Sequence, residues 1–374
     1  MNLHARYTIG MNRTALLAFA ITVSSPFAAQ MTAAENWNSK SAAAYLDGRS
    51  EWWETWSKSA RDHGTFCVSC HTAVPYGISR LTLRTALGEQ GPSAPEQKLL
   101  ANVTKRVRIW SEAEPFYKDN PGGPTKSSES RGTESVLNAL ILSAYDAPTG
   151  KLTDDTRTAF NNMWALQITS GEKRGAWIWL DFHNRPWEAD DSQFYGAALA
   201  AVAVGATPAE YRANPDVNEK LELLKTYLKA NYEGQSPINR LAVLWASSRI
   251  PGILTAPQRQ SLIDELVSKQ QPDGGWSLSA LAGLWKRLDK TELETKSDGY
   301  ATGQIAYILQ QAGIGRDQKP VKQGLAWLAA NQSKTDGLWQ AYSLNKERDL
   351  SSDIGLFMSD AATAYAVLAL TGGN

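Results

Sequence analysis

The sequence predicts an all-α protein folded as a single (α/α)6 toroid, a closed ring of six helical hairpins. Two observations lead to this fold class. Segments that are apolar on nearly every face alternate six times with segments that carry one apolar stripe and one charged face. A helix that is apolar all round must be buried inside something, whereas an amphipathic helix covers it from outside. Linkers containing Gly and Trp recur between them, which is typical of a repeat architecture.

The amphipathic segments are predicted to be the outer helices of the ring. In the fifth of them, Leu262 and Leu266 form the apolar stripe, and Asp264 and Glu265 face outward. The outer helices are expected at 40–60, 96–112, 153–168, 215–231, 256–270 and 319–333. The inner, apolar helices are expected at 74–89, 133–147, 190–205, 236–249, 298–313 and 359–371.

The linkers form a second repeat, in which an outer helix ends in Gln and a turn leads to Gly-x-Trp or a related sequence. The clearest examples run from Gln271 to Trp276 and from Gln332 to Trp339, and Gln167 with Trp177 is a longer form. Glycine permits the turn that ends a helix. The Trp is expected to pack back over the helix ends, where its indole N–H finds an acceptor. We therefore interpret the linker motif as structural.

These Gln…Gly-x-Trp turns within paired helices resemble the terpenoid cyclase and protein prenyltransferase toroid superfamily, especially its squalene–hopene cyclase branch. The resemblance covers most of the chain at the level of architecture. It implies a hydrophobic, isoprenoid-like ligand. The zinc site of the prenyltransferases is not expected, because the only two cysteines lie together in one linker.

The segment Glu188-Ala189-Asp190-Asp191-Ser192 is similar to the Asp-x-Asp-Asp-Thr motif of the squalene–hopene cyclases. The resemblance implies that Asp190 is an acid that protonates an alkene or epoxide, with Glu188 and Asp191 as its supports. Crowded carboxylates raise one another's pKa and so keep a proton at neutral pH. Acidic residues near the starts of other inner helices, Glu134, Asp298 and Asp360, either cap those helices or lie on the same mouth of the ring.

The pentapeptide Cys67-Val68-Ser69-Cys70-His71 has the C-x-x-C-H spacing used for covalent haem attachment. It predicts one haem c, with thioethers at Cys67 and Cys70 and His71 as axial iron ligand. Met358 is the candidate for the distal position. A Cys67–Cys70 disulfide, a redox-active pair and part of a zinc site remain open as alternatives. The motif replaces a linker of the first repeat, since 64–66 occupies the Gly-x-Trp position.

Basic residues, an apolar run at 15–23 and small residues follow one another at the N-terminus, as in a secretory signal peptide. We expect a signal at 1–34, the toroid at 35–374, and a periplasmic or otherwise exported protein. The run is too short to span a membrane, so membrane contact is expected to be peripheral at most. With 38 basic and 38 acidic residues and no basic stripe, nucleic acid is not an expected partner.

Three functions follow from these predictions. The first is an exported haem c protein that transfers electrons to a redox partner protein or oxidises an isoprenoid-like substrate. The second is a terpenoid cyclase-like enzyme that protonates an alkene through Asp190. The third is a scaffold that binds a hydrophobic ligand without chemistry.

Overall fold

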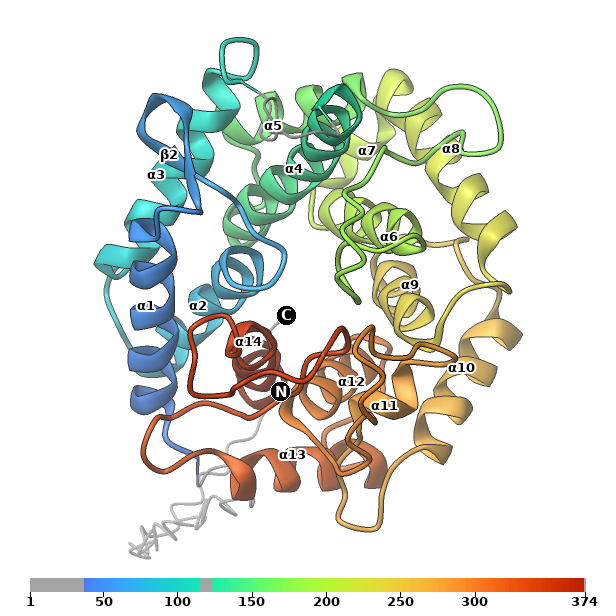
Figure 1. Cartoon of the computed structure of the whole chain (residues 1–374). Helices are drawn as coiled ribbons and strands as arrows, with labels where there is room; N and C mark the ends of the chain where they lie inside the picture. Colours follow the sequence, from blue (N-terminus) through green and yellow to red (C-terminus); the bar gives the residue numbers. More distant parts are fainter. Residues whose placement is uncertain (1–36, 115–122, 373–374) are drawn as a thin grey trace, which may run out of the picture. The chain divides into compact units, whose positions relative to one another are not determined.

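Six helical hairpins form a ring in the computed structural model, which describes residues 37–114 and 123–372 (Figure 1). Each hairpin pairs one outer helix with one inner helix, as the alternation in the sequence predicts. The outer helices are α1 (Ser39–Thr55), α3 (Ala94–Arg108), α5 (Asp154–Ala165), α8 (Pro215–Asn231), α10 (Ala256–Ser268) and α13 (Lys319–Asn331). The inner helices are α2 (Ala73–Leu87), α4 (Gly123–Asp146), α6 (Ser192–Gly205), α9 (Pro237–Arg249), α12 (Gly299–Gln311) and α14 (Phe357–Thr371).

The inner helices make the ring continuous, because each packs against the next and α14 returns to α2. Nearly every residue of α6, α12 and α14 is buried, including their small alanines. The predicted fold class, an all-α (α/α)6 toroid, is confirmed. The predicted signal peptide at 1–34 lies outside the described residues. No helix in the described ranges combines the length and apolar character needed to cross a membrane.

Short elements complete the fold. The chain between α1 and α2 contains the 3-10 turn η2 (Asp62–Gly64) and a small antiparallel pair of strands, β1 (Ala60–Arg61) and β2 (Thr65–Phe66). The remaining short helices are η3 (Ala147–Thr149), α7 (Ala209–Ala213) and α11 (Leu278–Leu281). One helix boundary differs strongly from the prediction, because α4 begins ten residues before 133. Its first turns are polar, with a Lys126–Glu129 pair at i,i+3 spacing, so they carry no apolar signal.

The linker tryptophans fasten each turn to the helix before it. The indole N–H of Trp177 donates to the carbonyl of Met163, that of Trp276 to Leu266, and that of Trp339 to Leu328, each at 2.7 Å. All three side chains are fully buried. The predicted structural role of these tryptophans is therefore confirmed.

The linker glutamines fasten each repeat to the next one. The Gln167 amide donates to the carbonyls of Gly175 and Lys220, so it joins its own turn to α8. Gln270, one residue before the predicted Gln271, donates in the same way to Gly274 and Pro320.

Gln332 makes the equivalent bonds at the point where the ring closes. Its amide donates to the Gly337 carbonyl at 2.9 Å and to the Asn38 carbonyl at 3.0 Å. Asn38 is the N-cap residue of α1, so the last repeat is joined to the first by the contact used between the others. Gly337 has φ 77° and lies against Ser41, where a Cβ atom would come within 2.4 Å of backbone. Only glycine fits both conditions.

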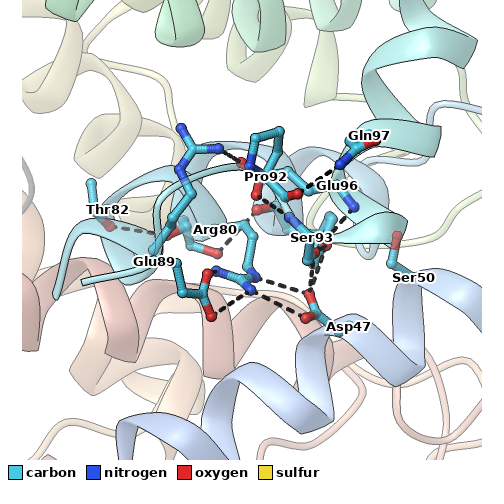
Figure 2. Close-up of polar contacts among 12 residues, drawn as sticks. Asp47, Ser50, Arg80, Thr82, Glu89, Pro92, Ser93, Glu96 and Gln97 are labelled. Atoms are coloured by element: carbon cyan, nitrogen blue, oxygen red, sulfur yellow. Dashed lines mark hydrogen bonds and ion pairs between the residues drawn. The ribbon is translucent and has the colours of Figure 1, made fainter. Parts of the chain in front are cut away.

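The first hairpin is held to α3 by a polar network around Arg80 (Figure 2). The Arg80 guanidinium, almost fully buried in α2, donates to Asp47 of α1 at 2.9 Å and to Glu89 at 2.7 Å. The Asp47 carboxylate also accepts from the Ser93 hydroxyl at 3.2 Å, and Ser93 caps α3. A buried guanidinium is tolerated only when its donors are paired, as they are here. The network fixes α1 and α2, which carry the site described next.

Candidate functional site

A pocket of about 110 Å³ lies where the first repeat meets the last. Residues from the loop before α2, the loop before α6, the segment 343–355 and the start of α14 line it. Arg348 from the segment 343–355 brings a positive charge to the lining. The residues that line it include His71, Asn184, Trp187, Glu188, Phe357 and Met358. The pocket thus brings together His71, Glu188 and Met358, three of the side chains that the sequence singled out.

A chain of hydrogen bonds fixes the orientation of His71. The Thr72 hydroxyl donates to Oδ2 of Asp360 at 2.8 Å and lies 2.8 Å from Nδ1 of His71. Because the hydroxyl proton is used on Asp360, its oxygen accepts from Nδ1, and the network assigns the tautomer with the proton on Nδ1. Nε2 is then the ring nitrogen left with a free lone pair. Burial, followed by the charge of Arg49, lowers the pKa of His71 to about 3, so the imidazole is neutral at physiological pH.

Asp360 anchors this chain from the far end of the sequence. Its carboxylate accepts from Nε of Arg49 and from the Tyr45 hydroxyl, each at 2.8 Å. Burial raises the pKa of Asp360, while Arg49 and the hydrogen bonds act in the opposite direction. Asp360 is therefore neither a helix cap nor an open acid. Two residues of α1 position a carboxylate of α14, which in turn positions the imidazole before α2.

Glu188 reaches the pocket from a tight turn before α6. The amide of Glu188 donates to the carbonyl of Asn184, and the amides of Phe182 and Asn184 donate to the carbonyl of Glu188. The indole of Trp179 also donates to the Trp187 carbonyl at 2.8 Å, which holds the turn against the core. Burial raises the pKa of Glu188 to about 7, although a hydrogen bond from Asn184 and the charges of Lys126 and Arg61 oppose the shift. Glu188 is half-buried and is one of the residues that line the pocket.

The other two carboxylates of the Glu188–Asp191 cluster point elsewhere. Asp190 is exposed over 68% of its side chain and lies 3.5 Å from the Arg185 guanidinium. Asp191 is half-buried beside Ser236, and burial, reinforced by the charge of Asp190, raises its pKa. The structure does not bring the three carboxylates to one point. Of the three, Glu188 is the one that lines the pocket beside His71.

Two further acidic residues have structural partners. Asp298 accepts from the amides of Tyr300 and Ala301, each at 2.9 Å, as the N-cap of α12. Glu134 lies well inside α4 and accepts from Nη2 of Arg106 at 2.8 Å. The capping interpretation therefore holds for Asp298, whereas Glu134 forms an ion pair between α3 and α4.

Aromatic rings surround His71. Its imidazole stacks on Phe357 with ring centroids 3.8 Å apart, and the edge of Trp53 approaches it at 4.9 Å. Trp52 and Trp56 stack on each other at 5.0 Å, and both lie within 6.3 Å of Phe357. This cluster joins α1 to α14 and so connects the first repeat with the last.

These surroundings contradict the prediction of a covalent haem c at Cys67 and Cys70 with His71 as iron ligand, which we correct. Within 37–114 and 123–372, no group of three or more His, Cys, Asp and Glu side chains is placed to hold a metal ion. A cavity of about 150 Å³ just holds benzene, and the pocket beside His71, at about 110 Å³, is smaller. A porphyrin, several times larger, does not fit. Met358 is buried and lines the same pocket. Without a haem, its predicted role as the distal iron ligand is also wrong.

Several residues of the site were not singled out as site residues from the sequence. Thr72, Arg49 and Phe357 are separated from one another along the chain, and their types are common in helices. A signal for Thr72 did exist, because it follows His71 directly and begins an inner helix. No signal could pair Arg49 with Asp360, since 311 residues separate them and only ring closure brings them together.

Comparison with known proteins identifies no family. No protein-family model matches the chain, and no curated protein matches it. Among solved structures, one similar chain is an inactive variant of an alpha-1,6-mannanase from a Salegentibacter species, in complex with alpha-1,6-mannotriose. It is 12% identical, with a TM-score of 0.49, over 88% of this chain and all of the other.

Proposed function

We propose that this protein is an enzyme of the terpenoid cyclase type that protonates a carbon–carbon double bond, with Glu188 as the general acid. The observation that carries the proposal is a carboxyl group with a pKa of about 7 on a residue that lines the same pocket as Trp187 and Phe357. A group with that pKa holds a proton near neutral pH and releases it readily, as a general acid must. The proposal assigns the acid role to Glu188 rather than to Asp190.

The proton of the Glu188 carboxyl would add to the less substituted carbon of the double bond, whose π electrons form the new C–H bond. The positive charge then appears on the neighbouring carbon. The rings of Trp187 and Phe357 line the same pocket, and aromatic faces attract a cation. The neutral imidazole of His71 adds no positive charge to the pocket, although the guanidinium of Arg348, which also lines it, does. The Glu188 carboxylate can take back a proton from an adjacent carbon, which regenerates the acid and completes an isomerisation.

The size of the pocket limits the group that enters it. At about 110 Å³ it holds only one end of a long substrate. The five-carbon end of an isoprenoid chain is the reacting group that we propose, with the rest of a longer substrate lying outside the pocket. The apolar contacts to Met358 and Phe357 suit such a group.

Deuterium incorporation tests the proposal directly. The protein is incubated in D2O with squalene or a shorter prenyl alcohol, and mass spectrometry measures deuterium in the recovered hydrocarbon. We expect Glu188→Gln to lower the incorporation rate by about 10²–10⁴-fold, the usual contribution of a general acid. Because the protonated form is the active one, kcat/KM should be constant below pH 7 and fall as pH rises through about 7.

Asp190→Asn is the matched comparison, because it removes a solvent-exposed carboxylate from the same cluster. Retention of activity in this variant, together with loss in Glu188→Gln, supports the assignment. The reverse result would return the acid role to Asp190. Binding of the lipid by the wild-type protein without any deuterium uptake would contradict the enzyme proposal and favour a ligand-binding scaffold.

A further inference from the structure

The two cysteines lie in the loop between β2 and α2, and they differ in access to solvent. Both are free thiols in this structure. Cys67 is partly exposed, whereas Cys70 is only 6% exposed. The chain contains no other cysteine. A more accessible thiol three residues before a buried one is the arrangement in which the first can attack an external sulfur and the second can attack the first.

Hydrogen bonds hold the loop in place around both thiols. The Cys67 amide donates to the Ser59 carbonyl at 2.8 Å, and the Trp53 indole donates to the Cys67 carbonyl at 2.7 Å. On the other side, the Ser69 hydroxyl oxygen accepts from the Ala73 amide at 3.0 Å, which caps the first turn of α2. The thiols are thus carried by a fixed turn at the start of a helix of 15 residues.

Charged groups from several elements act on the two sulfur atoms. Burial raises the pKa of both thiols, so they are protonated at rest. The charge of Glu188 raises the pKa of both thiols. At Cys67, Glu134 also raises the pKa, whereas Arg61 and Arg106 lower it. At Cys70, the charge of Cys67 raises the pKa. A thiol must lose its proton before it can attack. Because its charge raises the pKa of both cysteines, Glu188 is the carboxyl group that both thiols sense.

We propose that Cys67 and Cys70 form a dithiol–disulfide couple that exchanges electrons with a disulfide in a partner molecule. The Cys67 sulfur attacks one sulfur of that disulfide, which forms a mixed disulfide and releases one thiol. The Cys70 sulfur then attacks Cys67, which forms the Cys67–Cys70 bond and releases the second thiol. The two cysteines lose two electrons and two protons, and the partner disulfide gains both. Glu188 accepts the Cys70 proton and passes it to the departing sulfur. The inference does not depend on alkene protonation.

Thiol counting tests the couple. The purified full-length protein is equilibrated in glutathione buffers of graded potential, quenched with acid, denatured and alkylated, and its mass is measured. We expect a single transition between two labelled thiols and none, without a populated one-label state. Because these are the only cysteines, each label reports on this loop.

Single variants separate the two steps. Cys70→Ser should accumulate a mixed disulfide at Cys67, whereas Cys67→Ser should not, because Cys70 is buried. Glu188→Gln should slow formation of the internal disulfide by at least about tenfold and leave the first step unchanged. Circular dichroism of each variant verifies that the helices are intact. Parallel reactions with oxidised glutathione and with a small protein bearing one exposed disulfide show which kind of partner reacts faster.

Three results would overturn the inference. The first is a pair of cysteines that cannot be alkylated even after denaturation and reduction, which would mean that both sulfur atoms are already in other covalent bonds. The second is equal trapping by Cys67→Ser and Cys70→Ser. The third is a protein that keeps two free thiols at every potential in the series.

Discussion

Among single residues, Thr72 determines which ring nitrogen of His71 carries the proton. Its hydroxyl lies 2.8 Å from both His71 Nδ1 and Asp360 Oδ2. Thr72→Val keeps the shape of the side chain but removes the hydroxyl. We expect the proton on Nδ1 to lose its acceptor, so the fraction of the other tautomer should rise.

Nitrogen-15 chemical shifts of the His71 ring measure this change, because protonated and bare ring nitrogens resonate far apart. Thr85→Val is the control, since Thr85 is an exposed threonine on the same helix. Identical His71 spectra for the wild type and Thr72→Val would contradict the assigned tautomer.

At the scale of the helix, the contact between α12 and α14 depends on Gly303. A Cβ atom there would lie 2.6 Å from the backbone nitrogen of Ala366, closer than packed atoms approach. The two helices must therefore separate when Gly303 is replaced by alanine. We expect Gly303→Ala to lower the free energy of unfolding by about 1–3 kcal/mol, the usual cost of overpacking. Denaturant unfolding followed by circular dichroism measures it.

Gly48→Ala is the matched control, because Gly48 lies inside α1 with nothing within 4 Å of the added atom. Alanine is the better helix former, so this variant should gain about 0.5–1 kcal/mol. If both substitutions shifted stability in the same direction, the close approach of α12 and α14 would not be the cause.

For the molecule as a whole, closure of the ring depends on an ion pair between its first and last repeats. Arg49 of α1 and Asp360 of α14 are 8% and 2% exposed at their side chains, and their atoms lie 2.8 Å apart. Arg49→Ala would leave the Asp360 charge buried without its partner. We expect a loss of about 3–5 kcal/mol in the free energy of unfolding.

Arg108→Ala provides the comparison, because it breaks an ion pair with Asp155 at the same short range but with an arginine that is 67% exposed. Its cost should stay within about 1 kcal/mol. Comparable losses for the two variants would mean that the buried pair does not hold the ring closed.

Much of this architecture could be predicted from the sequence, since the residue patterns that define each hairpin lie within the repeat itself. Alternating apolar and amphipathic segments locate the six hairpins, and local turn chemistry explains Trp177, Trp276 and Trp339. Helix α4 was placed too late because its first turns have no apolar pattern. The spacing of Cys67, Cys70 and His71 predicts haem, and this prediction is wrong because a local motif carries no information about the volume of the space around it.

The sequence by itself therefore determined the ring, because periodic burial and turn residues act over a few neighbours. Only the tertiary structure decided which of the clustered carboxyl groups lines the pocket beside His71, since Glu188, Asp190 and Asp191 differ in their surroundings rather than in their chemistry. It also decided the state of His71, whose proton depends on Thr72, Asp360 and Arg49. The physical reason is that burial and nearby charges set a pKa or a tautomer. Ring closure creates that burial and brings together charges that are far apart in the sequence, such as Arg49 and Asp360, which are 311 positions apart.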